Sequence, residues 1–171
     1  TIAKIGANNG EKIHNKQKIF INHEGSNKRN SIEIEKKENT KNFIRVIAGP
    51  QMNYFFPKTI QKFFKRSFRV SNSSNRMGVR LYNNICKAVI SHNIPSEGII
   101  KGSVQVPGDG NPIVLLNDHP TIGGYPKIAT VILTDIHKLA QLPMGSNFFF
   151  ELISLDEAEY LYIDSMLEME R

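Results

Sequence analysis

The chain has 171 residues, 40% of them hydrophobic, with a formal net charge of +6 at pH 7, and no apolar run approaches the roughly 20 residues that span a bilayer. Its positive charge lies in residues 1–70, at +10, whereas residues 71–171 carry −4, and the lysines are scattered among Asn and Ile. These features exclude a transmembrane protein and favour a solvated basic surface over a nucleic-acid-binding one.

The first half of the chain predicts strands followed by one helix. Residues 16–22 and 31–35 alternate apolar and polar side chains as strands do, and Phe43–Ala48 is an apolar strand that ends at Gly49. Pro57 then opens a short helix, because proline is favoured in the first helical turn. Its apolar residues share one face, and they are Ile60, Phe63 and Phe64.

The second half predicts short strands and two further helices. We expect strands at residues 67–70, 79–82, 98–106, 113–116, 128–133 and 147–153. Thr134 is expected to cap a helix that runs to Gln141, and Ser154 with Glu157 forms a capping box for a C-terminal helix over residues 155–171. The apolar stripe of that last helix is expected to face the core, and it consists of Leu155, Ala158, Leu161, Tyr162 and Met166.

This pattern predicts an all-β fold, a barrel or sandwich with two or three short helices. The length predicts a single domain over residues 1–171. Cys86 is the single cysteine and cannot form an internal disulfide, and residues 2–20 are too polar for a signal peptide. We therefore expect a cytoplasmic protein in which Cys86 is a free structural thiol.

Three blocks are too rich in Gly, Pro and polar residues for plain strands, at residues 74–81, 102–113 and 117–129. Arg76 and Arg80 lie four apart and, in a strand, would share a face that could bind a carboxylate, although they could equally bond neighbouring groups. Gln105 lies between Val104 and Val106, so in a strand its side chain faces opposite to theirs. If that face is the barrel interior, the buried amide needs a partner, from a ligand or from the protein.

The third block contains the remaining candidates. Asp118 and His119 form an adjacent pair of an acid and an imidazole, which makes His119 either a general base or a loop histidine. We expect Gln105, Asp118, His119 and Tyr125 to converge at one mouth of a barrel. Further substrate-binding candidates are Gly123 and Gly124, which would let a ligand approach the backbone, together with Lys127 and Gln51.

Nothing in the sequence predicts a metal site or a nucleotide cradle within this chain. The five histidines are dispersed without ligand-type spacing, and there is neither a G-x-x-x-x-G-K-[ST] loop nor a G-x-G-x-x-G motif after a strand.

Several ordered motifs resemble one protein family. They are Gly49-Pro-Gln51, Ser74-Asn-Arg-Met-Gly-Val-Arg-Leu81, Ser96-Glu-Gly98, Val104-Gln-Val-Pro107, Gly110-Asn-Pro-Ile113, Gly123-Gly-Tyr-Pro-Lys-Ile-Ala129 and Leu139-Ala-Gln141. Together they resemble allophanate hydrolase subunit 2, the biotin-dependent carboxyltransferase domain-containing proteins, which include the C subunit of bacterial 5-oxoprolinase and part of urea carboxylase. The likeness is close over residues 43–154 and loose over residues 1–42.

The resemblance implies a cyclophilin-like β-barrel and a component of an ATP-dependent 5-oxoprolinase complex with A-type and B-type partner subunits. This chain alone would bind no cofactor. The first alternative is the carboxyltransferase of a urea carboxylase, with biotin on a partner, and the second is a non-catalytic binding module or a degraded fragment. The family's N-terminal half has no counterpart here, so we expect the C-terminal part of a larger protein. Pro120 and Ile122 replace a Gln and a Thr that the family favours, which puts activity in question.

Overall fold

The computed structural model describes residues 8, 11, 13–18, 43–82, 86 and 90–169, and the chain divides into two compact units, Thr1–Glu38 and Asn39–Arg171. In the first unit the amide Nε2 of Gln17 donates to Oδ1 of Asn8 at 2.7 Å. Residues 16–18 lie in a turn and irregular backbone, and the rest of the two strands predicted at 16–22 and 31–35 lies outside the described residues.

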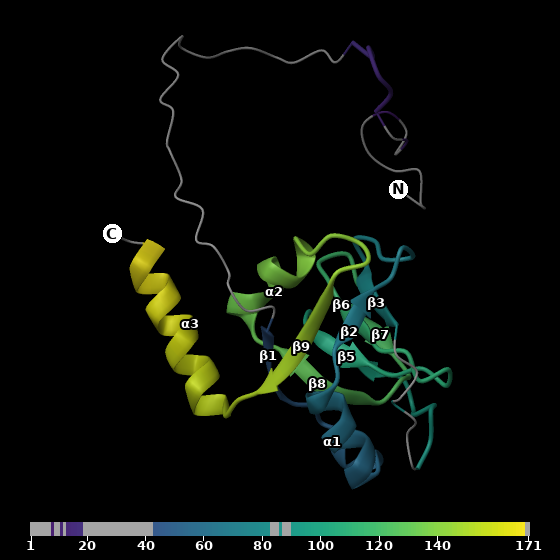
Figure 1. Cartoon of the computed structure of the whole chain (residues 1–171), viewed down its shortest axis with the longest axis vertical. Coiled ribbons are helices and arrows are strands. Elements are labelled where there is room, and N and C mark those ends of the chain that lie inside the picture. The colour runs from purple at the N-terminus through teal and green to yellow at the C-terminus, as the bar shows by residue number, and fades with distance from the viewer. Residues whose placement is uncertain are drawn as a thin grey trace. The chain divides into compact units, whose positions relative to one another are not determined.

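The second unit is a closed, mainly antiparallel β-barrel of seven strands, in the order β1-β8-β5-β6-β3-β2-β9, with parallel pairing of β9 and β1 closing it (Figure 1). Two short strands, β4 and β7, form a separate two-stranded sheet. The mainly-β prediction is therefore confirmed. The strands are β1 Phe43–Ala48, β2 Phe68–Val70, β3 Gly78–Tyr82, β4 Glu97–Gly98, β5 Ser103–Gln105, β6 Ile113–Leu115, β7 Ile122–Gly123, β8 Lys127–Val131 and β9 Asn147–Leu152.

Three α-helices accompany the barrel: α1 Pro57–Lys65, α2 Leu133–Ala140 and α3 Leu155–Met169, and a 3-10 turn, η2, spans Met52–Tyr54. Figure 1 shows α1 and α2 near opposite ends of the barrel and α3 on its flank. Pro57 begins α1 as predicted. Of the described helices, none combines the length and apolar character that a bilayer crossing requires.

The core is built around four phenylalanines from α1, β2 and β9. Phe63 stacks on Phe150 with ring centroids 4.8 Å apart, and it also contacts Phe68 at 5.0 Å. Phe148 lies edge-on to Phe150 at 5.1 Å. All four rings are buried, so α1 is fixed to the barrel by aromatic packing.

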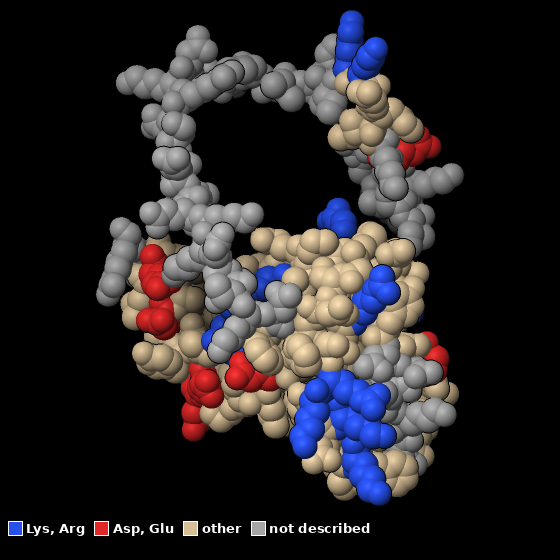
Figure 2. Space-filling model, viewed as in Figure 1, with Lys and Arg blue, Asp and Glu red and all other residues tan. Residues whose placement is uncertain are grey.

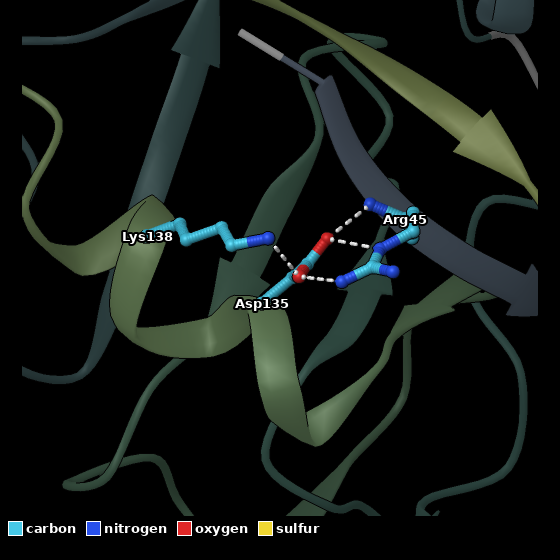
Figure 3. Close-up of polar contacts among 3 residues, drawn as sticks. All are labelled: Arg45, Asp135 and Lys138. Carbon is cyan, nitrogen blue, oxygen red and sulfur yellow. Dashed lines mark hydrogen bonds and ion pairs between the residues drawn. The ribbon is translucent and has the colours of Figure 1, made fainter. Parts of the chain in front are cut away.

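A buried ionic cluster joins α2 to β1 (Figure 3). The carboxylate of Asp135 is fully buried, and its Oδ2 accepts from the backbone N–H of Arg45 at 2.9 Å and from its Nε at 3.0 Å. Its Oδ1 accepts from Arg45 Nη2 and from Lys138 Nζ, each at 2.7 Å. Burial opposes ionisation of Asp135, but these donors outweigh it and lower the pKa of the carboxyl.

Three sequence-based predictions need correction. The strand expected at 98–106 is interrupted over residues 99–102, which end in a turn at Gly102 with a φ of 89° that favours glycine, so it is two strands, β4 and β5. Thr134 does not cap α2, because α2 begins one residue earlier and Ile132 is at the cap position. Ser154 does cap α3, since its Oγ accepts from the Glu157 N–H at 3.1 Å.

The third correction concerns the stripe on α3. No residue of this helix is buried, and Leu155, with 57% of its surface exposed, faces solvent together with Tyr162 and Met166. An apolar groove of about 520 Å³ separates α3 from the barrel; its walls include Ile47, Val131 and Tyr162. The stripe is therefore incompletely covered.

Candidate functional site

The candidate residues of the sequence analysis fall at two different ends of the barrel. At one end β1 and β5 finish and β8 begins, because Ala48 pairs with Ala129 and Gln105 pairs with Lys127. We call this the Lys127 end. At the other end β6 finishes and α2 starts, and we call it the α2 end.

At the Lys127 end, two side chains donate to one carboxylate oxygen of a third. The ammonium of Lys127, a residue only 4% exposed, donates to Oε1 of Glu97, and the amide Nε2 of Gln51 donates to the same oxygen at 2.8 Å. Gln51 in turn accepts the backbone N–H of Lys127 on its own Oε1 at 3.1 Å. Lys127 begins β8 and Gln51 lies in the turn after β1, whereas Glu97 comes from β4 in the small sheet.

The small sheet covers Gln105. Glu97 pairs with Gly123 across β4 and β7. A Cβ on Gly123 would lie 2.6 Å from Nε2 of Gln105, so glycine is what allows this close packing. Gln105 is 5% exposed, and its Nε2 has no hydrogen-bond partner among the residues that the structure describes. An unsatisfied buried amide costs about 1–3 kcal/mol, so this donor is available to an acceptor.

The electrostatics of this cluster keep Glu97 ionised. The hydrogen bond from Lys127 lowers the pKa of the Glu97 carboxyl, burial works against it, and Gln51 lowers it further. Lys127 is thus a buried cation balanced by a carboxylate that is 42% exposed. Gly124 and Tyr125 follow on the same loop, where the carbonyl of Gly124 accepts from the Ile94 N–H at 2.8 Å and Tyr125 is 39% exposed.

The α2 end holds Arg76, Asp118 and His119. Nε of Arg76 is 2.9 Å from Oδ2 of Asp118, and both side chains are substantially exposed. Nδ1 of His119 is 2.6 Å from the carbonyl oxygen of Pro120. A cavity of about 710 Å³ opens here, with polar walls from Arg76, Lys101 and Asn117.

The expected convergence of Gln105 with Asp118 and His119 is not what the fold produces. Gln105 pairs with Ile113 at the start of β6, whereas Asp118 follows the far end of β6 and its N–H donates to the carbonyl of Arg76. Three residues of strand, at about 3.3 Å each, place Leu116 about 10 Å from Ile113. The structure brings together Gln51, Gln105, Gly123, Gly124, Tyr125 and Lys127 at one end, and Arg76, Asp118 and His119 at the other.

Arg76 and Arg80 do not share a strand. Arg76 lies in the tight turn closed by Asn75 and Gly78, before β3 begins, and Arg80 lies within β3 with an exposed side chain. Asn111 is the main cause of a lowered pKa of the Asp109 carboxyl, and the Arg80 guanidinium contributes to it. The two arginines therefore face different acidic groups.

Glu97 is the site residue that the sequence analysis did not single out. It appears there only within the Ser96-Glu-Gly98 motif. Its role depends on the pairing of β4 with β7. Each of these strands has two residues, which is too short for an alternating pattern that would predict a strand from the sequence. Over the described ranges, no group of three or more His, Cys, Asp or Glu side chains could hold a metal ion.

Comparison with known proteins gives consistent matches. Residues 1–152 match the family described as carboxyltransferase domain, subdomain A and B. Over 136 residues the chain is 41% identical to the 5-oxoprolinase C subunit of Escherichia coli, covering 78% of this chain and 44% of that protein. It is 38% identical over 118 residues to the 5-oxoprolinase C subunit of Haemophilus influenzae, covering 69% of this chain and 38% of that protein.

Among solved structures, the Kluyveromyces lactis urea amidolyase aligns with a TM-score of 0.61 at 25% identity, covering 68% of this chain and 8% of that one. The chain spans less than half the length of the two bacterial relatives.

Proposed function

The chain belongs to the carboxyltransferase domain family, subdomains A and B, and from this membership we propose that it is part of a 5-oxoprolinase C subunit, which serves in ATP-dependent hydrolysis of 5-oxoproline to glutamate. The observation that carries the proposal is the identity to two bacterial 5-oxoprolinase C subunits, which exceeds that to the urea amidolyase structure. We further propose that the barrel is of the cyclophilin-like type and that the protein is cytoplasmic.

The Lys127 end supplies side chains that suit this substrate. 5-Oxoproline carries a carboxylate and a lactam carbonyl, so its binding calls for a cation and for hydrogen-bond donors. Lys127 is the buried cation, and Gln51 and Gln105 supply amide donors at the same end of the barrel. A donor at the carbonyl oxygen would stabilise the charge that forms when water adds to the carbonyl carbon and the C–N bond breaks.

The α2 end supplies the candidate base. His119 with Asp118 remains our proposal for general-base catalysis, and Arg76 would orient Asp118 through their ion pair. Because this pair lies at the opposite end from Gln105, it would not reach a water that attacks a carbonyl bound there. It would act instead on a group that a partner protein brings to the α2 end. Arg80 would bind an anionic group of the partner from its exposed position in β3.

We propose that the chain works within a complex with A-type and B-type subunits, in which ATP is bound by a partner. Supporting this, α3 leaves apolar side chains such as Leu155 and Ile163 uncovered beside the groove. Figure 2 shows acidic residues gathered over α3 and basic ones over α1. The described part of α3 carries acidic side chains and no Lys or Arg, so its complement is a basic, apolar segment of the B-type protein.

A second candidate function is biotin-dependent carboxyl transfer in a urea carboxylase. The match to the carboxyltransferase family model and the similarity to the urea amidolyase structure favour it. The same donors at the Lys127 end would then bind the carboxylate of carboxybiotin. A third candidate, a binding module without catalysis, is favoured by Pro120 and Ile122 in place of the polar residues that the resemblance leads one to expect.

One experiment separates these functions. The whole protein that contains this chain is combined with its A-type and B-type partners, and glutamate release from 5-oxoproline is measured with and without ATP. ATP-dependent glutamate release supports the 5-oxoprolinase function. Consumption of carboxybiotin in the presence of urea, without glutamate release, would establish carboxyl transfer instead. Formation of the complex without either reaction would identify a binding module.

A further inference from the structure

The small sheet formed by β4 and β7 brings a carboxylate of the protein itself onto donors that belong to the barrel. Oε1 of Glu97 accepts from both Lys127 and Gln51. Lys127 begins β8 and Gln51 lies in the turn after β1, and two hydrogen bonds join them. The Lys127 N–H donates to the side-chain Oε1 of Gln51 at 3.1 Å, and the Gln51 N–H donates to the Lys127 carbonyl at 3.2 Å. The donors are therefore fixed by the barrel, and the acceptor is the part that the small sheet supplies.

Burial also differs between the donor Lys127 and the acceptor Glu97. The side chain of Lys127 is 5% exposed, whereas that of Glu97 is 42% exposed. A buried ammonium needs an anionic partner, because an unpaired charge away from water is costly. A partly exposed glutamate on a two-residue strand has no such need, because water can solvate its carboxylate once it leaves. The arrangement therefore fixes the cation and leaves the anion exchangeable.

A second observation points to a ligand. Within the described part of the chain, Nε2 of Gln105 is buried without a hydrogen-bond partner, and Gln105 lies beside Lys127 in the register of β5 and β8. The backbone of Gly123, the residue that pairs with Glu97, covers this amide. Moving the β4–β7 sheet outward would thus release the Glu97 carboxylate and uncover the Gln105 amide in one step.

We propose that Lys127 and Gln51 form a carboxylate-binding site that Glu97 occupies in this structure, and that a small carboxylate ligand with a neighbouring carbonyl displaces Glu97. The ligand carboxylate takes the place of Oε1 of Glu97, and its carbonyl oxygen accepts from Nε2 of Gln105. The choice of 5-oxoproline as the natural ligand rests on the proposed function, whereas the carboxylate site rests on the geometry alone. Glu97 is then a built-in competitor of the substrate.

The test measures ligand-dependent thermal stabilisation of the whole chain, with wild type, Glu97→Gln and Glu97→Ala compared in sodium acetate and in sodium chloride of equal ionic strength. Removing the competing carboxylate should strengthen acetate binding, so we expect the acetate-specific shift in Tm to be at least twofold larger in Glu97→Ala than in wild type. Asp164→Ala, which removes an exposed carboxylate on α3, is the matched control and should behave as wild type. Equal acetate shifts in wild type and both Glu97 variants would overturn the proposal.

Two further measurements test whether Lys127 and Gln51 form the acetate site and whether 5-oxoproline binds there. Lys127→Met in the Glu97→Ala background should abolish the acetate-specific shift in Tm. If that double variant does not fold, Gln51→Met in the same background is measured in its place. Retention of the shift in these variants contradicts the site. 5-Oxoproline is then titrated into Glu97→Ala while the side-chain amide resonances of Gln105 are followed by NMR. Binding at least tenfold tighter than to wild type, with a shift at Gln105, supports both the site and the proposed function. Acetate binding without 5-oxoproline binding upholds the carboxylate site and removes the proposed substrate.

Discussion

Replacing Asp135 by asparagine removes the charge on which the junction between α2 and β1 depends. The carboxylate accepts from the backbone N–H, Nε and Nη2 of Arg45 and from Nζ of Lys138, and it is fully buried. An asparagine of nearly the same volume keeps one oxygen but turns an NH₂ group toward the donors of Arg45. Breaking a buried pair in this way costs about 3–5 kcal/mol. Because about a quarter of each cationic side chain is exposed, water can recover part of the loss, and we expect about 3 kcal/mol.

The chain has no tryptophan, so urea unfolding is followed by circular dichroism. With a slope of about 2 kcal/mol/M, the loss lowers the midpoint by about 1.5 M urea. Asp164→Asn on the exposed face of α3 is the control and should change stability by less than about 0.5 kcal/mol. Arg45→Met with Asp135→Asn should cost less than the sum of the single changes, because the double variant leaves no unpaired guanidinium. A loss below about 1 kcal/mol for Asp135→Asn, or strict additivity, would show that the buried charge does not hold this junction.

Three further predictions follow from individual contacts. The folded-state pKa of Asp135 is lowered, so its contribution to the free energy of unfolding is fully present above the unfolded pKa of about 3.9. That contribution is lost as the pH falls through the folded value. In acid titrations, wild type should therefore lose more stability than Asp135→Asn below about pH 4. Gly49→Ala should destabilise by about 3 kcal/mol or prevent folding, since its Cβ would lie 2.4 Å from the carbonyl oxygen of Lys127; a urea midpoint equal to wild type would contradict this. Burial raises the pKa of the Cys86 thiol to about 12, so iodoacetamide should label it only in urea, and rapid labelling of the native protein would be inconsistent with the structure.

The sequence was informative where one element decides its own structure. β1 follows from its apolar run, and α1 follows from Pro57 and from the helical spacing of Ile60, Phe63 and Phe64, which pack as that spacing requires. These features depend on local periodicity and need no knowledge of which strands are neighbours.

The site depended on strand pairing, which local patterns do not contain. Lys127 and Gln105 become neighbours only through the register of β8 and β5, which shifts between Val104 and Gln105. Glu97 reaches Lys127 through the small sheet, and Asp118 is held at the α2 end by Arg76. The exposure of α3 was equally unpredictable, because an apolar stripe specifies a surface to be covered and not what covers it.

Binding of substrate at the Lys127 end of the barrel is best tested by the turnover of site variants. ATP-dependent glutamate release from 5-oxoproline is measured in the complete complex for Gln105→Leu, for His119→Ala and for Lys58→Gln, an exposed residue of α1 that serves as the control. We predict that Gln105→Leu lowers kcat/KM at least 10-fold, since a donor at the developing oxyanion contributes about 10²-fold or more, while Lys58→Gln matches wild type. His119→Ala should lower kcat about 10²-fold if the imidazole is the general base, and a change below roughly threefold would assign it to structure. Full activity in Gln105→Leu would contradict binding at this end, because a substrate bound there must contact this buried amide.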